Sequence, residues 1–214
     1  MSIDRHPLLA REGWWHIAVT LAVSSLLTWL IGFFWSLPMW LFFLFNLQFF
    51  RDPKRDIPRI ENAVLAPADG KIIHVAEEQD PYLDRPALKI SVFMNVFSVH
   101  SNRSPISGEI RDRWYHEGAF FNAALDKASE QNERNALWIH GQQHDVVFVQ
   151  VAGLIARRIL CYVNPGDQLQ AGERYGFIRF GSRVDLYLPS GSHLDKKLGD
   201  WVTAGTDTLA YLPS

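Results

Sequence analysis

The stretch RFGSRVDLYLP, residues 179–189, sets a Gly-Ser pair between two short apolar runs. These runs, residues 175–180 and 184–188, are rich in the aromatic and aliphatic side chains that favour β-strands. A flexible linker would have polar neighbours, whereas a glycine between apolar strands is typical of a bulge or of a close backbone approach. Gly181 and Ser182 are therefore predicted to lie within a sheet, and composition alone favours a bulge.

The same alternation of short apolar runs with Gly, Pro and Asp continues outward over residues 51–214. Residues 120–129, FFNAALDKAS, have the apolar spacing of the one plausible helix. We therefore expect a mainly β domain with a minor helical part, folded as a compact sandwich or barrel. The predicted strands are residues 71–76, 88–93, 106–115, 146–151, 159–163, 175–180, 184–188 and 208–212.

A short block, Gly-Asp-x-x-x-Ala-Gly, occurs at residues 166–172 and again at 199–205, an offset of 33 residues. Each copy has the composition of a turn that leads into an apolar strand. Two copies are too few for a solenoid. They favour two similar hairpins wrapped into one small domain, as in the biotinyl and lipoyl carrier domains.

The N-terminal part differs in kind, because residues 13–50 contain no Asp, Glu, Lys or Arg. The apolar run 14–34 would be about 31 Å long as a helix, close to the hydrocarbon thickness of a bilayer. The second run, 35–50, is short for a full crossing and could return through the membrane or lie in the interface. A buried hairpin of a soluble protein is the alternative, and a cleaved signal peptide fits poorly because the run is too long.

Basic residues flank both ends of this segment, with Arg5 and Arg11 before it and four more between residues 51 and 59. By the positive-inside rule both ends stay in the cytoplasm, which favours a hairpin or a re-entrant anchor. We thus expect a membrane-anchoring segment at residues 1–50 and a β domain at residues 51–214. The β domain is expected on the cytoplasmic face of the cell membrane.

Composition limits the function classes. The formal charge of -2 gives no basic field for nucleic acid. The single Cys161 cannot form an internal disulfide and, within an apolar strand, is interpreted as a small buried hydrophobe. None of the eight His stands in a metal motif such as His-Glu-x-x-His, so no metal is predicted.

Two further residues could do chemistry. Asp69 lies in Pro-Ala-Asp-Gly, residues 67–70, a combination typical of a tight turn. His100 lies in Phe-Ser-Val-His-Ser-Asn-Arg, residues 97–103, directly after an apolar strand. Taken singly, each is more often structural than catalytic.

Together, these motifs form an ordered set that covers nearly the whole chain and follows a membrane segment. The chain resembles the phosphatidylserine decarboxylase proenzymes of the short bacterial and archaeal type. The motifs that carry the resemblance are FFRDP at 49–53, APADGK at 66–71, NVFSVHSNR at 95–103, YHEGAF at 115–120 with NER at 132–134, and RFGSRVD at 179–185.

The resemblance implies an enzyme that makes its own pyruvoyl cofactor from Ser182. His100 would act as the base and Asp69 would orient it, as in a serine triad. Attack of Ser182 on Gly181 would split the proenzyme into a β chain, residues 1–181, and an α chain, residues 182–214, which stay together as a heterodimer. The new ketone would accept the electrons released with CO2 as phosphatidylserine becomes phosphatidylethanolamine.

The resemblance also leaves questions about substrate binding. Arg103, Arg111, Arg113 and Arg183 are chemically suited to the lipid phosphate, although Arg on strand faces is commonly just solvated. Longer members of the family have a second His where this chain has Phe97. Partners would be the bilayer and its phospholipid, with a higher oligomer possible and no nucleic acid.

A second hypothesis from another class is a membrane-anchored carrier or adaptor of the lipoyl or biotinyl kind. Such a carrier presents a modified Lys at a hairpin tip, for which only Asp-Lys-Lys at 195–197 is suitable. This hypothesis does not explain a Gly-Ser pair within apolar strands, nor the motifs around Asp69 and His100. The mass of the purified chains distinguishes the two hypotheses, because only the first requires self-cleavage.

Overall fold

The structure is a computed structural model that describes residues 8–124, 131–154, 158–179 and 181–213. The chain divides into two compact units, Met1–Lys54 and Arg55–Ser214. Each unit has its own internal packing.

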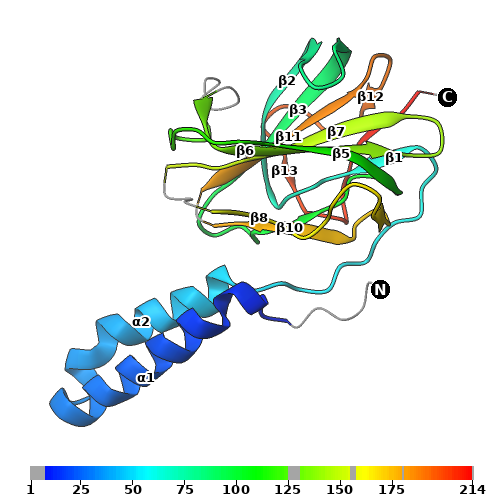
Figure 1. Cartoon of the computed structure of the whole chain (residues 1–214). Coiled ribbons are helices and arrows are strands. Elements are labelled where there is room, and N and C mark those ends of the chain that lie inside the picture. Colours follow the sequence, from blue (N-terminus) through cyan, green and yellow to red (C-terminus); the bar gives the residue numbers. More distant parts are fainter. Residues whose placement is uncertain (1–7, 125–130, 155–157, 180, 214) are drawn as a thin grey trace. The chain divides into compact units, whose positions relative to one another are not determined.

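The first unit is a pair of apolar helices (Figure 1). A short 3-10 turn, η1 (Arg11–Gly13), leads into α1 (Trp14–Ile31), and α2 (Phe33–Phe49) follows after one residue. That residue is Gly32, whose φ of 87° favours glycine and ends α1. The two helices are joined by Thr28, whose hydroxyl bonds Ser36 at 2.8 Å and accepts the Trp40 indole N–H at 2.9 Å.

Most of the large apolar side chains of this pair are exposed. Within the described residues, Arg11–Ile31 is the one helical stretch long and apolar enough to cross a membrane, with a mean hydropathy of 1.5. The second helix is apolar but shorter. The two predicted N-terminal apolar helices are therefore confirmed, and their exposed apolar surface indicates association with a membrane.

The described residues of the second unit form three antiparallel sheets. The largest has the strand order β13-β2-β3-β11-β7-β6-β5-β9, and two three-stranded sheets have the orders β1-β14-β12 and β4-β10-β8. The strands are β1 (Ala63–Leu65), β2 (Gly70–Asp80), β3 (Arg85–Met94), β4 (Ser101–Arg103), β5 (Gly108–His116), β6 (Arg134–His140), β7 (Asp145–Val151), β8 (Ile159–Cys161), β9 (Gln168–Leu169), β10 (Arg174–Ile178), β11 (Ser182–Pro189), β12 (His193–Leu194), β13 (Trp201–Val202) and β14 (Thr208–Tyr211).

The large sheet curls into a half-barrel around one main core (Figure 1). Successive side chains of a strand point to opposite faces, so β11 contributes Val184, Leu186 and Leu188 to this core. The alternate side chains Arg183, Asp185 and Tyr187 lie on the outer face. Other members of the main core are Ile72, Ile90, Val92, Met94, Ile139, Val146 and Phe148.

The mainly β fold is confirmed, and all eight predicted strands are present with shifted ends. The main omission is β6, whose sequence RNALWIH has a polar residue at an inward position. The expected helix at 120–129 is not seen in its described part, where residues 120–122 are irregular and 123–124 form a turn. The remainder of that segment lies outside the described residues. Cys161 is half-buried instead of fully buried.

The two Gly-Asp-x-x-x-Ala-Gly blocks form matching turns. Their first glycines, Gly166 and Gly199, both have a φ of 95°, and their last, Gly172 and Gly205, have 76° and 71°. The first block is hydrogen-bonded through its backbone to β5 and the second to β2. The two copies thus dock in the same way on two different strands of the large sheet.

A second internal repeat is apparent only in the structure. Residues 65–72 and 103–110 both contain Pro-x-x-Gly followed by a strand, at an offset of 38 residues. They bond reciprocally, because Leu65 N–H donates to the Pro105 carbonyl at 2.8 Å and Arg103 N–H donates to the Pro67 carbonyl at 2.9 Å. The domain therefore has an internal pseudo-twofold relation in which Asp69 and Ser107 occupy equivalent positions.

Candidate active site

Ser182 is the first residue of β11, in the middle of the large sheet. Its backbone is paired with Met94 at the end of β3. Alternation along β11 sends its side chain to the inner face, where Met94 belongs to the main core. The side chain is fully buried, and its hydroxyl has no hydrogen-bond partner among the described residues. A buried hydroxyl without a partner is costly, which favours a functional role.

Gly181 has a φ of 61°, a left-handed conformation that favours glycine. Its carbonyl oxygen lies so close to Gly153 that a Cβ added there would be 1.7 Å from it. Gly153 lies two residues after the end of β7, the neighbour of β11 in the sheet. Two glycines thus allow the Gly181–Ser182 peptide to lie against a neighbouring backbone, instead of forming the simple bulge that composition favoured.

His100 is fully buried just before β4. Its carbonyl accepts the Ile178 N–H at 3.2 Å, and its ring lies 6.2 Å from that of Phe177, between centroids. Two residues later, the Asn102 amide contacts the Met94 sulfur at 3.8 Å. His100 is therefore tied to both segments that flank Ser182, the end of β10 and the end of β3.

Asp69 lies one residue before β2 and is held by two groups. Both of its carboxylate oxygens bond Nη2 of Arg55, at 2.9 and 2.8 Å, and Oδ1 also accepts the Ala204 N–H at 2.8 Å. The strand register places Lys71 and Arg183 on either side of Phe93 of β3. The backbones at Asp69 and Ser182 are therefore about 10 Å apart, twice the usual spacing of neighbouring strands.

Each of the four arginines considered for the lipid phosphate bonds another group of the protein. Arg183 lies on the outer face of β11, opposite Ser182, where it pairs with Asp185 at 2.7 Å and donates to the Ala123 carbonyl. Arg103 is buried and donates to the Gly172 carbonyl at 3.1 Å. Arg111 is exposed and pairs with Glu109, and Arg113 donates to the Asn135 amide oxygen. These placements do not favour a shared phosphate site.

A buried polar chain on the inner side of the sheet was missed by the sequence analysis. The Asn135 amide donates to Gln150 at 3.0 Å, and the Gln150 amide donates to Asn102 at 2.9 Å. All three side chains are fully buried, and Asn102 leads on to Met94 beside Ser182. The sequence signal that could have predicted this chain is an Asn or Gln at an inward position of an otherwise apolar strand.

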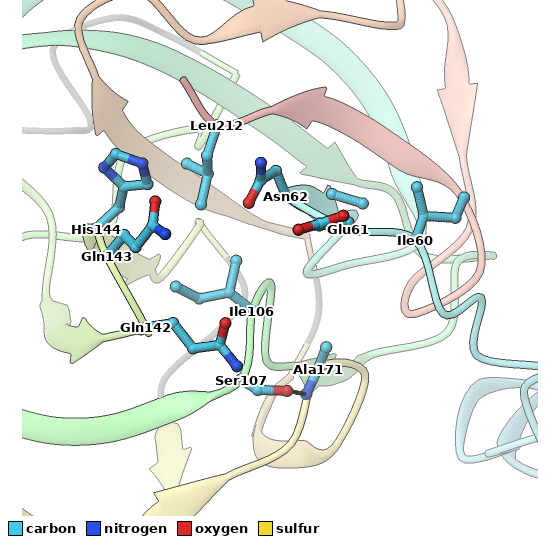
Figure 2. Close-up of a pocket in the computed structure, with 12 residues that line it drawn as sticks. Ile60, Glu61, Asn62, Ile106, Ser107, Gln142, Gln143, His144, Ala171 and Leu212 are labelled. Carbon is cyan, nitrogen blue, oxygen red and sulfur yellow. Dashed lines mark hydrogen bonds between the residues drawn. The ribbon is translucent and has the colours of Figure 1, made fainter. Parts of the chain in front are cut away.

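A separate pocket of about 340 Å³ lies away from these residues (Figure 2). It is lined by residues that include Glu61, Ser107 and His144, and Figure 2 shows the Ser107 hydroxyl bonded to the Ala171 N–H. His144 precedes β7, whereas Ser182 is level with the far end of that strand. Ser182 and this pocket therefore lie at opposite ends of β7.

Comparisons with known proteins give the family. Residues 42–210 match the family model described as phosphatidylserine decarboxylase. The chain is 61% identical over 209 residues to a protein of Aromatoleum aromaticum named phosphatidylserine decarboxylase proenzyme, covering 97% of each chain. The chain belongs to the phosphatidylserine decarboxylase family. Proteins of the same name from Nitrosomonas europaea and Burkholderia pseudomallei are 60% and 57% identical, each over at least 95% of both chains.

Membership in the phosphatidylserine decarboxylase family confirms the resemblance drawn from the motifs. The word proenzyme in the relatives' names fits a chain whose Gly-Ser bond lies at the start of a buried strand. Phe97, at the position where the resemblance implies a second His in longer members, is 63% exposed.

Proposed function

We propose that this chain is a self-processing phosphatidylserine decarboxylase whose reactive residue is Ser182. The observation that carries the proposal is a fully buried hydroxyl with no hydrogen-bond partner among the described residues, directly after a glycine of positive φ, in a chain of this family. The activity is that of a carboxy-lyase, which converts phosphatidylserine to phosphatidylethanolamine and CO2. The family evidence leaves no reason to retain the carrier hypothesis.

Self-processing begins when the Ser182 oxygen adds to the Gly181 carbonyl carbon. The C–N bond between the two residues breaks, which leaves an ester and a free amine on residue 182. Loss of the α-proton of residue 182 then expels the Gly181 carboxylate and leaves dehydroalanine. Water replaces the nitrogen, so ammonia leaves and a pyruvoyl group becomes the new N-terminus of β11.

His100 and Asp69 serve the first of these steps. His100 takes the hydroxyl proton, because a serine is weakly nucleophilic without an adjacent base. Asp69 orients the imidazole and stabilises its charged form. These two roles are supported by where the residues lie. The strand register and the contact of Asn102 with Met94 bring Asp69, His100 and Ser182 to the same end of β3.

The family's cofactor is a pyruvoyl group derived from a serine of the chain. The site around Ser182 suits such a group, because it is buried on the inner face and the Ser182 hydroxyl bonds no group in the part of the chain that the structure describes. When present, the ketone supplies the electron sink for loss of CO2. His100 then returns a proton to the α-carbon of the substrate, since an imidazole can both give and take protons near neutral pH.

The substrate would reach this end of the domain from a membrane. An apolar rim, made by the exposed residues Phe97 (63%), Leu154 (66%) and Phe121 (37%), lies within three residues of positions tied to Gly181–Ser182, because Met94 pairs with Ser182 and Gly153 lies against both the Gly181 carbonyl and Ala123. We place this rim on the cytoplasmic side of the cell membrane, following the basic residues that flank the helices.

Replacing Phe97 and Leu154 by Ser should lower activity on vesicles at least about threefold, with little change on a short-chain soluble substrate. Equal losses on the two substrates would contradict this placement of the rim.

The decisive experiment is the mass of the purified, active protein. We expect two chains, residues 1–181 and 182–214, with a pyruvoyl group at the start of the smaller, and an uncut chain for Ser182→Ala. A smaller chain that begins at Ser192 would move the reactive bond to Gly191–Ser192. A single intact chain in active protein would exclude the mechanism.

A further inference from the structure

Arg55 contacts Asp69, one of the three proposed processing residues, through its guanidinium group. Its Nη2 lies 2.9 and 2.8 Å from the two oxygens of Asp69. The pair is largely shielded from water, with the side chains 11% and 18% exposed. An ion pair that is shielded in this way is less screened by salt than a surface pair, and the guanidinium fixes the plane of a carboxylate better than an ammonium does.

The segment that carries Arg55 is itself held in place. Arg55 is the first residue of the second unit, directly after the unit of apolar helices. Two residues later, Ile57 fills the space over Gly172 and Gly205, since an added Cβ would lie 2.3 and 3.3 Å from its side chain. This packing against the paired turns positions the segment that presents the guanidinium to Asp69.

The internal repeat shows which part of this arrangement the turn needs. At the equivalent position, Ser107 accepts the Ala171 N–H at 2.8 Å, as Asp69 accepts the Ala204 N–H at 2.8 Å. A serine hydroxyl therefore suffices for the turn contact. The Asp69 carboxylate and its bond to the Arg55 guanidinium therefore go beyond what the turn contact requires. They occur in the copy of the repeat that lies beside the proposed reactive bond.

We propose that Arg55 is a positioning residue for self-processing, which fixes the carboxylate of Asp69 so that it can orient His100. A carboxylate has about four lone-pair sites, and Arg55 and Ala204 take three, so one is left for the imidazole. The proposal rests on the role proposed above for Asp69. It follows that processing depends on docking of the linker that joins the membrane helices to the β domain.

The test measures the rate at which the full-length precursor splits after synthesis in the presence of vesicles. Arg55→Met should slow splitting at least about tenfold, a fraction of the effect of removing a catalytic base. Arg55→Lys should recover part of the rate, because it restores the charge without the planar fork. Arg59→Met, an exposed residue on the same linker, is the matched control and should split normally.

Two measurements separate positioning from structural support. In precursors blocked by Ser182→Ala, Arg55→Met should shift the thermal unfolding midpoint by less than about 2 °C, the lower end of the range that a loss of about 1 kcal/mol gives a protein of this size. Adding Arg55→Met to Asp69→Ser should slow splitting no further, since the guanidinium acts through that carboxylate.

The outcomes are distinct. Normal splitting of Arg55→Met while Asp69→Ser fails would overturn this inference and leave the proposed function intact. Normal splitting of Asp69→Ser would overturn the role of Asp69 itself. A lowered unfolding midpoint for Arg55→Met, with no recovery by Lys, would make the pair structural.

Discussion

At the scale of single residues, the two copies of the Pro-x-x-Gly repeat supply a matched substitution. Asp69→Ser gives the first copy the residue found at Ser107, which already bonds the equivalent turn N–H. We expect the variant to fold, and to split at least about 100-fold more slowly because the base loses its orienting carboxylate. Splitting is followed by gel mobility of the full-length chain.

The reciprocal change, Ser107→Asp, is the control for this prediction and should leave splitting unchanged. If Asp69→Ser precipitates while Ser107→Asp is stable, the carboxylate is needed for the fold. If Asp69→Ser splits at the normal rate, the triad assignment is wrong.

His100→Ala should accumulate precursor, with splitting slowed by a factor of about 100 to 10,000, the usual contribution of a general base. The matched control is His144→Ala, because this half-exposed histidine bonds the Pro213 carbonyl in the separate pocket at the other end of β7. Equal effects of the two substitutions on splitting would show that loss of any packed histidine impairs folding.

At the scale of elements, the close approach of two loops controls the reactive peptide. Gly153→Ala would place a Cβ 1.7 Å from the Gly181 carbonyl oxygen, so one backbone must move. We expect splitting to slow at least about tenfold, since a small displacement at a reacting centre can cost far more than that. Gly141→Ala is the control, because its Cβ would come no closer than 3.1 Å to the end of the Ile106 side chain and 3.3 and 3.4 Å to the carbonyl oxygens of His144 and Ser107. A normal rate for Gly153→Ala would mean that this contact does not hold the bond.

The elements that could be predicted from sequence are those in which period and composition agree. The strand 184–188 has inward Val184, Leu186 and Leu188, all in the main core, and was placed correctly. β6 was missed because Asn135 lies inward, where its amide joins a buried polar chain. Local pattern cannot reveal such a residue, because its partners come from other strands.

The same limit applies to the site. Ser182, His100 and Asp69 are predicted from motifs whose family is now established, and their roles are the proposal made above. Arg55 was missed, because its partner is 14 residues away and no local pattern joins an arginine of a linker to an aspartate of a turn. The glycine at 153 carried no signal either, since its importance arises from a contact with another strand.

At the scale of the whole molecule, the two compact units suggest a division of labour between membrane and chemistry. The boundary between Lys54 and Arg55 leaves the processing residues and the proposed positioning residue in the second unit. A chain that begins at Arg51 keeps all of them and loses only the apolar helices. Such a chain should therefore still split at Gly181–Ser182 at close to the normal rate.

Its activity should depend on how the substrate is presented. A membrane helix is anchored almost irreversibly, so the full chain always meets its two-tailed lipid at high local concentration. The shortened chain must bind the bilayer through the weaker apolar rim around Phe97 and Leu154. We expect activity on vesicle-embedded phosphatidylserine to fall at least about tenfold, with a smaller change on a short-chain soluble analogue. Equal losses on both substrates, with normal splitting, would mean that the helices support the site itself and do not act mainly as an anchor.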